Sequence, residues 1–192
     1  IDACEGIQCS GHMVMENDFW GYGYPSIEEA IRVLTSHELF HGVQAAYNAE
    51  QPIWLSEGMA VWAEWAYDPE VQDFYAFSQA YLDETHRSIH RPPAGMITAF
   101  SYGTALFFAF LDEYLEQSPM PSIQEAVADR SDEEAIALVL EHLDSVEEGW
   151  LTFSQWNLAT GDRSGVLDSY SFASRLEGVS AEVDRKSTRL NS

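Results

Sequence analysis

Apolar residues recur with the period of a helix in the first quarter of the chain. Positions 27, 30, 31 and 34 are apolar, which places them on one face of a helix. Ser26 and Glu29 have the spacing of a capping box, in which each side chain bonds the backbone of the other residue. The pattern therefore predicts a helix from residue 26 to about Tyr47.

The same pattern predicts further helices and few strands. Residues 102–116 are apolar nearly all round, so we expect a helix buried in the core. Two more capping boxes, at Ser122 and Ser131, predict helix starts. Residues 11–17 are expected to form a short edge strand. Other helices are expected over residues 55–67, 69–87 and 147–158, and loops over 18–25, 88–100 and 161–165.

Length and composition indicate one soluble domain that is mainly α, with a small β component (α+β). The chain has 192 residues, of which 46% are hydrophobic and 21% are charged. Residues 185–192 differ in composition from the rest, so we expect a domain over 1–184 followed by a non-native tail. The chain begins at Ile1 rather than at a methionine, and we expect strands of the domain to lie upstream of it.

The charge of the chain disfavours two classes of partner. Asp and Glu number 32 against 9 Lys and Arg, which gives a net charge of −23. Nucleic acids and anionic membrane surfaces attract basic proteins, so neither is an expected partner. No run of apolar residues is long enough to span a bilayer, so membrane insertion is not expected.

The cysteines predict a local cross-link. Cys4 and Cys9 are separated by four residues within a polar segment that contains glycine. This arrangement favours a small disulfide loop, and the alternative is a pair of free thiols in a cytosolic protein. Two cysteines are too few for a four-thiolate zinc site.

The strongest chemical signal lies inside the first predicted helix. Residues 37–41 read His-Glu-Leu-Phe-His, which fits the zinc-protease pattern His-Glu-x-x-His. His37 and His41 are four residues apart, so both imidazoles project from one helix face and can bind one metal ion. Glu38 lies beside them, where a carboxylate can act as general base toward a metal-bound water. The alternative is an exposed pair of helical histidines without a metal.

A catalytic zinc site needs a third protein ligand. Metzincins supply a histidine six residues after the second histidine of the motif, with a glycine between them. Gln44 and Tyr47 stand at these two positions, so the chain does not fit that class.

A second motif follows at residues 54–64, which read Trp-Leu-Ser-Glu-Gly-Met-Ala-Val-Trp-Ala-Glu. Together with His-Glu-x-x-His, this segment resembles the third-ligand helix of aminopeptidase-N-like members of the gluzincin clan of zinc metallopeptidases. The resemblance implies that Glu57 is the third zinc ligand, and the fifteen residues after His41 leave room for a reversal and a returning helix. It also implies that Glu64, two turns further on, orients a ligand histidine, whereas the alternative is a solvated helix charge.

The resemblance covers about residues 27–116 and implies a zincin-like catalytic domain with one Zn²⁺ per chain and a peptide or protein substrate. The gap between the two motifs is shorter than in the aminopeptidase-N-like enzymes, and no motif that anchors the amino terminus of a substrate is evident. We therefore expect an endopeptidase. The layout is more similar to small bacterial gluzincin domains that are often exported, which implies a secreted or periplasmic location.

Gluzincins often use a Tyr or His to stabilise the oxyanion, and the resemblance implies Tyr102 for this role, although a packing tyrosine is the alternative. His86 and His90 are also four apart, but no acidic residue stands in a base position, so we interpret them as a solvated helix end.

Two other functions stay open: a catalytically degenerate gluzincin-like scaffold, and an acidic helical interaction domain with an accidental motif. An intact Glu38 favours the enzyme over the degenerate form.

Overall fold

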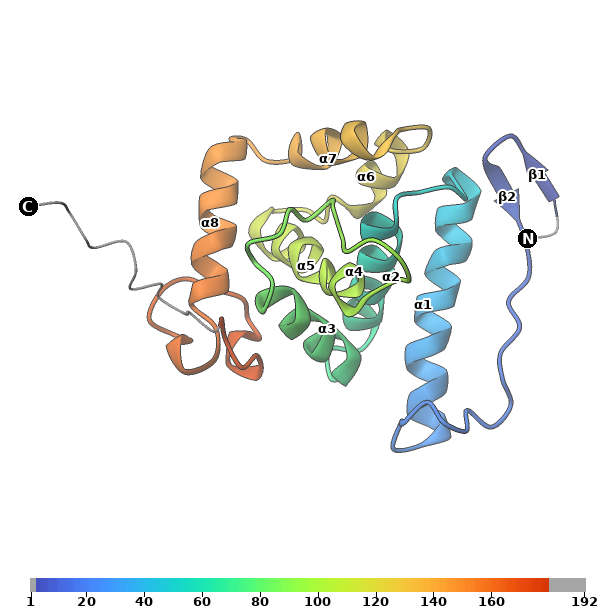
Figure 1. The fold of residues 1–192 in the computed structure, drawn as a ribbon, viewed down its shortest axis with the longest axis horizontal. Coiled ribbons are helices and arrows are strands. Elements are labelled where there is room, and N and C mark those ends of the chain that lie inside the picture. The colour runs from blue at the N-terminus through green and yellow to red at the C-terminus, as the bar shows by residue number, and fades with distance from the viewer. Residues whose placement is uncertain (1–2, 180–192) are drawn as a thin grey trace, which may run out of the picture.

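The structure, a computed structural model, describes residues 3–179 without the side chain of Asp132, and it is mainly helical (Figure 1). The expected tail over 185–192 lies outside the described residues. None of the described helices is both long and apolar enough to cross a membrane. The elements are β1 (Ala3–Glu5), β2 (Gln8–Ser10), α1 (Ile27–Tyr47), α2 (Ile53–Tyr67), α3 (Gln72–Leu82), α4 (Ala99–Gly103), α5 (Ala105–Tyr114), α6 (Met120–Ala126), α7 (Asp132–Leu140) and α8 (Val146–Leu158), with short 3₁₀ helices at Gly161–Arg163 and Ala173–Arg175.

Helix α1 begins and ends where the sequence predicts. The Ser26 side chain accepts a hydrogen bond from the Glu29 backbone N–H at 3.1 Å, which satisfies one of the unpaired donors of the first turn. At the other end, the Asn48 N–H donates to the Gln44 carbonyl at 2.7 Å. The 21-residue helix is therefore a continuous support for the residues of its central turns.

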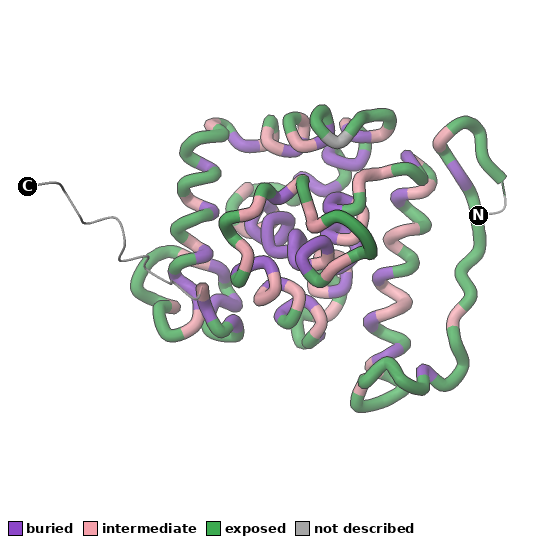
Figure 2. The backbone as a smooth tube through the Cα atoms, in the orientation of Figure 1, coloured by how far each residue is buried: buried purple, intermediate pink, exposed green. Residues whose placement is uncertain are grey.

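Helix α5 forms the centre of the core, as its apolar sequence predicts. Residues 105–111 are each 0% exposed, and the helix is buried along this length in the middle of the molecule (Figure 2). Aromatic side chains from α2 and α8 pack on it. The Trp54 and Phe108 rings stack with centroids 6.1 Å apart, and the Phe107 and Phe153 rings meet edge to face at 5.0 Å.

The predicted helix over 102–116 begins earlier, at Ala99, and is divided at Thr104 into α4 and α5. The Thr104 hydroxyl lies 2.6 Å from the Trp54 carbonyl and 2.7 Å from the Ser101 carbonyl. A threonine that bonds the carbonyl of a preceding turn disturbs the helical ladder. The same hydroxyl therefore interrupts the helix and joins the α4–α5 junction to α2.

Gly58 allows this close approach of α2. A Cβ built at Gly58 would collide with the Thr104 hydroxyl and lie 2.9 Å from the Phe108 ring. No side chain fits there without a shift of the neighbouring helix. The glycine follows Glu57 directly, so the contact fixes the part of α2 that carries this carboxylate.

Two predicted boundaries are wrong at the ends of α3, which is shorter than the expected 69–87. At its start, the Asp68 side chain accepts a hydrogen bond from the Glu70 N–H at 3.1 Å, which holds residues 68–71 in a turn. After its end, the Arg87 N–H donates to the Glu84 carbonyl at 2.8 Å, which is the tighter spacing of a turn. His86 therefore lies in a turn rather than at a helix end.

The two later capping boxes behave differently. Ser131 forms the predicted box with Glu134 and begins α7. Ser122 does not cap a helix, because α6 already begins at Met120 and the Ser122 hydroxyl donates to the Pro119 carbonyl at 2.8 Å. The predicted loop over 161–165 contains a 3₁₀ turn at Gly161–Arg163.

The β structure lies earlier than expected. Strands β1 and β2 form an antiparallel hairpin in which Cys4 faces Cys9, and these two residues form the predicted disulfide. The expected strand over 11–17 is not formed, because a strand needs a hydrogen-bonded neighbour and this segment has no strand partner among residues 3–179. It runs instead alongside α1 before the chain turns back into that helix (Figure 1).

Candidate metal centre

His37 and His41 project from one face of α1 toward α2. Their Nε2 atoms lie 3.0 Å apart, and the two rings meet nearly at right angles with centroids 4.6 Å apart. The His37 residue is 9% exposed and the His41 side chain 27%. The four-residue spacing therefore brings two nitrogen donors to one point, as the sequence predicts.

Glu57 on α2 completes a triangle of donor atoms. Its Oε2 lies 3.4 Å from His37 Nε2 and 3.5 Å from His41 Nε2. Ligand atoms of a tetrahedral zinc site, with bonds of about 2.0–2.2 Å, stand roughly 3.3–3.5 Å from one another. Within the described part of the chain, these three residues are the group of His, Cys, Asp or Glu side chains that could hold a metal ion.

Glu64 supports His37 from behind. Its Oε1 lies 2.6 Å from His37 Nδ1, and the residue is 2% exposed. This arrangement leaves Nε2 of the same ring free to face the triangle, which is how outer carboxylates orient metal-binding histidines. Glu64 is therefore not a solvated helix charge, which was the alternative to its predicted position.

Gln44 supports His41 in the same way, and the sequence analysis did not find this role. Gln44 Oε1 lies 2.7 Å from His41 Nδ1, and its Nε2 donates to the Ser56 carbonyl at 3.0 Å. The side chain is buried and links α1 to α2 beside Glu57. The available signal was its position three residues after His41, on the same helix face.

The electrostatics of the triangle favour a cation. Burial opposes a charge on His37, but the hydrogen bonds that it donates to Glu57 and Glu64 outweigh burial and raise its pKa to about 9. Burial also acts to raise the pKa of Glu57, but hydrogen bonds from His37 and His41 lower it to about 2. Burial raises the pKa of Glu64 to about 7. The protonated His37 and the ionised Glu57 stabilise each other, and a metal ion bound here would have to displace that proton.

Glu38 and Tyr102 lie beside the triangle. Glu38 is exposed on the outer side of α1 and lines the same groove as His41. The Tyr102 ring centroid lies 6.1 Å from that of His37 and stacks on Phe77 at 4.8 Å. Burial and the carboxylates of Glu57, Glu38 and Glu64 raise the pKa of the Tyr102 phenol, which keeps it a hydrogen-bond donor.

Two cavities adjoin the triangle, and His41 lines both of them. One, of about 380 Å³, lies between residues 10–14 and α1 and is lined by both Glu38 and His41. The other, of about 320 Å³, is lined by His41, Glu57 and the polar side chains Asn48 and Gln51. The imidazole of His41 is therefore accessible from both cavities.

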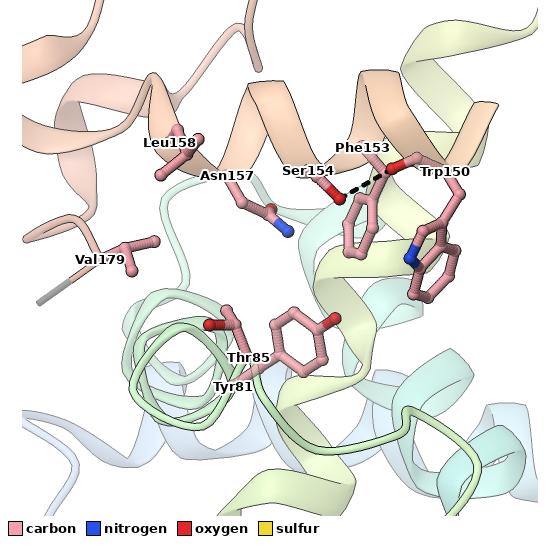
Figure 3. Close-up of a pocket in the computed structure, with 8 residues that line it drawn as sticks. All are labelled: Tyr81, Thr85, Trp150, Phe153, Ser154, Asn157, Leu158 and Val179. Carbon is pink, nitrogen blue, oxygen red and sulfur yellow. Dashed lines mark hydrogen bonds between the residues drawn. The ribbon is translucent and has the colours of Figure 1, made fainter. Parts of the chain in front are cut away.

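A third cavity lies on the far side of α3, between its end and α8 (Figure 3). It has a volume of about 260 Å³, and its walls include Tyr81, Phe153 and Asn157. None of the residues that line it is a His, Cys, Asp or Glu. It therefore lacks the groups that metal-assisted hydrolysis needs.

The second histidine pair does not form a site. His90 Nε2 accepts a hydrogen bond from Arg91 Nε at 3.2 Å, and Glu133 Oε2 lies 3.7 Å away. His86 belongs to no group of metal-binding side chains within residues 3–179. The interpretation of this pair as a solvated helix end is wrong, because both residues lie in turns and the His90 side chain is only 15% exposed.

Comparisons with protein-family models, with curated proteins and with solved structures find no match for this chain.

Proposed function

We propose that this protein is a zinc-dependent endopeptidase with a gluzincin-type site in a zincin-like domain. The observation that carries the proposal is the triangle of His37 Nε2, His41 Nε2 and Glu57 Oε2, whose edges of 3.0, 3.4 and 3.5 Å suit tetrahedral coordination. Two histidine nitrogens and one carboxylate are one of the donor sets of catalytic zinc sites, which keep the fourth position open. When bound, zinc would supply Lewis acidity at that open position.

The protein's own side chains would carry out the proton transfer, the stabilisation of the oxyanion and the orientation of the histidines. Glu38 stands on the groove side of the triangle, where its carboxylate can accept a proton from the attacking water and return it to the leaving amine. Tyr102 presents a neutral phenol near His37 and can donate a hydrogen bond to the developing oxyanion. Glu64 and Gln44 hold the two imidazoles in the orientation that binding requires.

The groove between residues 10–14 and α1 supports a peptide or protein as the substrate. It passes Glu38 and His41, and exposed apolar side chains border it, among them Met13 at 42% and Leu39 at 62% exposure. The Cys4–Cys9 disulfide supports a secreted or periplasmic location, since such bonds persist in oxidising compartments.

Zinc content and the variant Glu38→Gln test the proposal. We expect about one zinc per chain by elemental mass spectrometry after dialysis against metal-free buffer, because the ligand triangle is preformed. Glu38→Gln should keep the zinc. Its kcat on a fluorogenic peptide should fall by about 10²–10⁴-fold, because the variant lacks the general base.

The other outcomes separate the alternatives. Full zinc occupancy without cleavage of any peptide would indicate a degenerate scaffold. A folded chain that binds no added zinc would leave an acidic interaction domain. Unchanged activity in Glu38→Gln would overturn the role of this carboxylate.

A further inference from the structure

The β1–β2 hairpin is cross-linked internally by a disulfide and is bonded at its tip to the turn between α1 and α2. The Cys4–Cys9 disulfide closes it, and Cys9 is only 9% exposed. At its tip, the Ile7 carbonyl accepts a hydrogen bond from the Ala49 N–H at 2.8 Å. Ala49 lies in the turn between α1 and α2, the two helices that carry the metal ligands.

The segment that leaves this hairpin forms one wall of the groove. Residues 10–14 are all exposed, and they face Glu38 and His41 across the groove. Beyond the groove, Phe19 is buried at 8% exposure and the Tyr24 hydroxyl donates to Asp73 at 2.6 Å. The exposed wall is therefore held between two anchored ends, and the hairpin is the end nearer to the groove.

We propose that the Cys4–Cys9 hairpin is a positioning element for substrate binding, which holds residues 10–14 at a fixed distance from α1. The inference rests on the proposed function, because the occupant of the groove is the extended peptide proposed above. Strands of three residues are too short to keep a hairpin in shape by themselves. With the disulfide open, peptide binding would also have to order the wall, which weakens affinity.

The first experiment measures peptide affinity in the absence of turnover. The double variant Cys4→Ser with Cys9→Ser is made in the zinc-loaded Glu38→Gln protein, and a fluorescein-labelled decapeptide is titrated by anisotropy. We expect Kd to rise about tenfold while zinc stays at one per chain. In the protein with intact Glu38, KM should rise by a similar factor, with kcat at saturation changed less than about twofold.

A second pair of variants tests the hydrogen bond between the Ala49 N–H and the Ile7 carbonyl and leaves the disulfide intact. Ala49→Pro removes the N–H that bonds Ile7, and Asn48 before it is extended (φ −159°, ψ 111°), a conformation that proline tolerates in its predecessor. Ala49→Gly keeps the N–H and is the matched control. We expect Ala49→Pro to raise Kd about as much as loss of the disulfide, and Ala49→Gly to bind peptide like the parent protein.

The outcomes separate this inference from the proposed function. Unchanged Kd in both the disulfide variant and Ala49→Pro, with zinc retained, would overturn the role of the hairpin even if cleavage depends on Glu38. A lower melting temperature with unchanged Kd would show a purely structural disulfide and overturn it equally. Affinity that depends on the disulfide in a protein that cleaves nothing would sustain the hairpin's role and refute the peptidase. A parent protein that binds no peptide at concentrations up to about 1 mM, a weak-binding limit, would refute the inference.

Discussion

The two histidines of the triangle are held by different kinds of partner. His37 faces the buried carboxylate of Glu64, whereas His41 faces the amide of Gln44. A carboxylate makes its imidazole a stronger electron donor, and an amide fixes the ring without adding charge. The amide also bonds the Ser56 carbonyl, so it couples the orientation of His41 to the position of α2.

Gln44→Ala should therefore weaken zinc binding by about 10–100-fold, because His41 loses the group that fixes its ring. Gln44→Glu keeps an oxygen acceptor for His41 Nδ1 and should lose less affinity. Competition with a chromogenic zinc chelator measures both constants. Equal affinities of Gln44→Ala and the parent protein would show that His41 is positioned by its helix alone.

At the scale of elements, the site depends on how closely α2 approaches the junction of α4 and α5. Gly58 leaves room for Thr104, whose hydroxyl contacts the Trp54 carbonyl one turn earlier on α2. Gly103 allows a similar approach to α3, since a Cβ there would meet the backbone of Phe77 and lie 3.0 Å from Tyr81. These contacts place Glu57 opposite the histidines of α1.

Gly58→Ala should lower the free energy of unfolding by about 1–3 kcal/mol, because the added methyl group forces neighbouring helices apart. Gly42→Ala is the matched control in α1, where a built Cβ meets nothing within 4 Å. It should be neutral or stabilising by up to about 1 kcal/mol, the helix-propensity difference between the two residues. Urea unfolding in the presence of EDTA measures both without a contribution from metal. An unchanged free energy of unfolding in Gly58→Ala would contradict this prediction and show that the α4–α5 junction can shift to accommodate a methyl group.

At the scale of the whole molecule, buried phenols join the helical core to the C-terminal part of the chain. The Tyr170 hydroxyl donates to Asn157 Oδ1 at 2.6 Å, and Tyr81 is 3% exposed between α3 and α8. Burial raises the pKa of both phenols above the ordinary 10.0. Folding therefore favours their neutral forms.

Stability should consequently fall above about pH 10. The folded pKa of each phenol exceeds the unfolded value, so its contribution is complete below pH 10.0 and is lost as the pH rises toward the folded pKa. Each phenol should add about 1.4 kcal/mol per pH unit to the slope of the unfolding free energy. Urea titrations between pH 8 and 11.5 measure this slope. Tyr81→Phe should reduce it and Tyr67→Phe, at an exposed position, should not; equal slopes in both variants would contradict this account.

The sequence by itself determined the features that depend on neighbours in the chain. Helix α1 and the shared face of His37 and His41 follow from hydrogen bonds and side-chain spacing within a few residues. The burial of α5 follows from its composition, and the cross-link of Cys4 and Cys9 from their proximity in sequence. Local patterns predict such features because their partners lie within one or two helical turns.

The tertiary structure alone decided which distant groups meet. The Gln44 side chain is held by the Ser56 carbonyl of α2, and the helix break at Thr104 depends on the close approach of Gly58. Neither contact produces a repeating pattern in the sequence. The segment over 11–17 was expected to be a strand but has no strand partner among the described residues, and its first part instead lines the groove beside α1. Pairing and close packing are properties of surfaces that come together only on folding, and a pattern along the chain does not specify them.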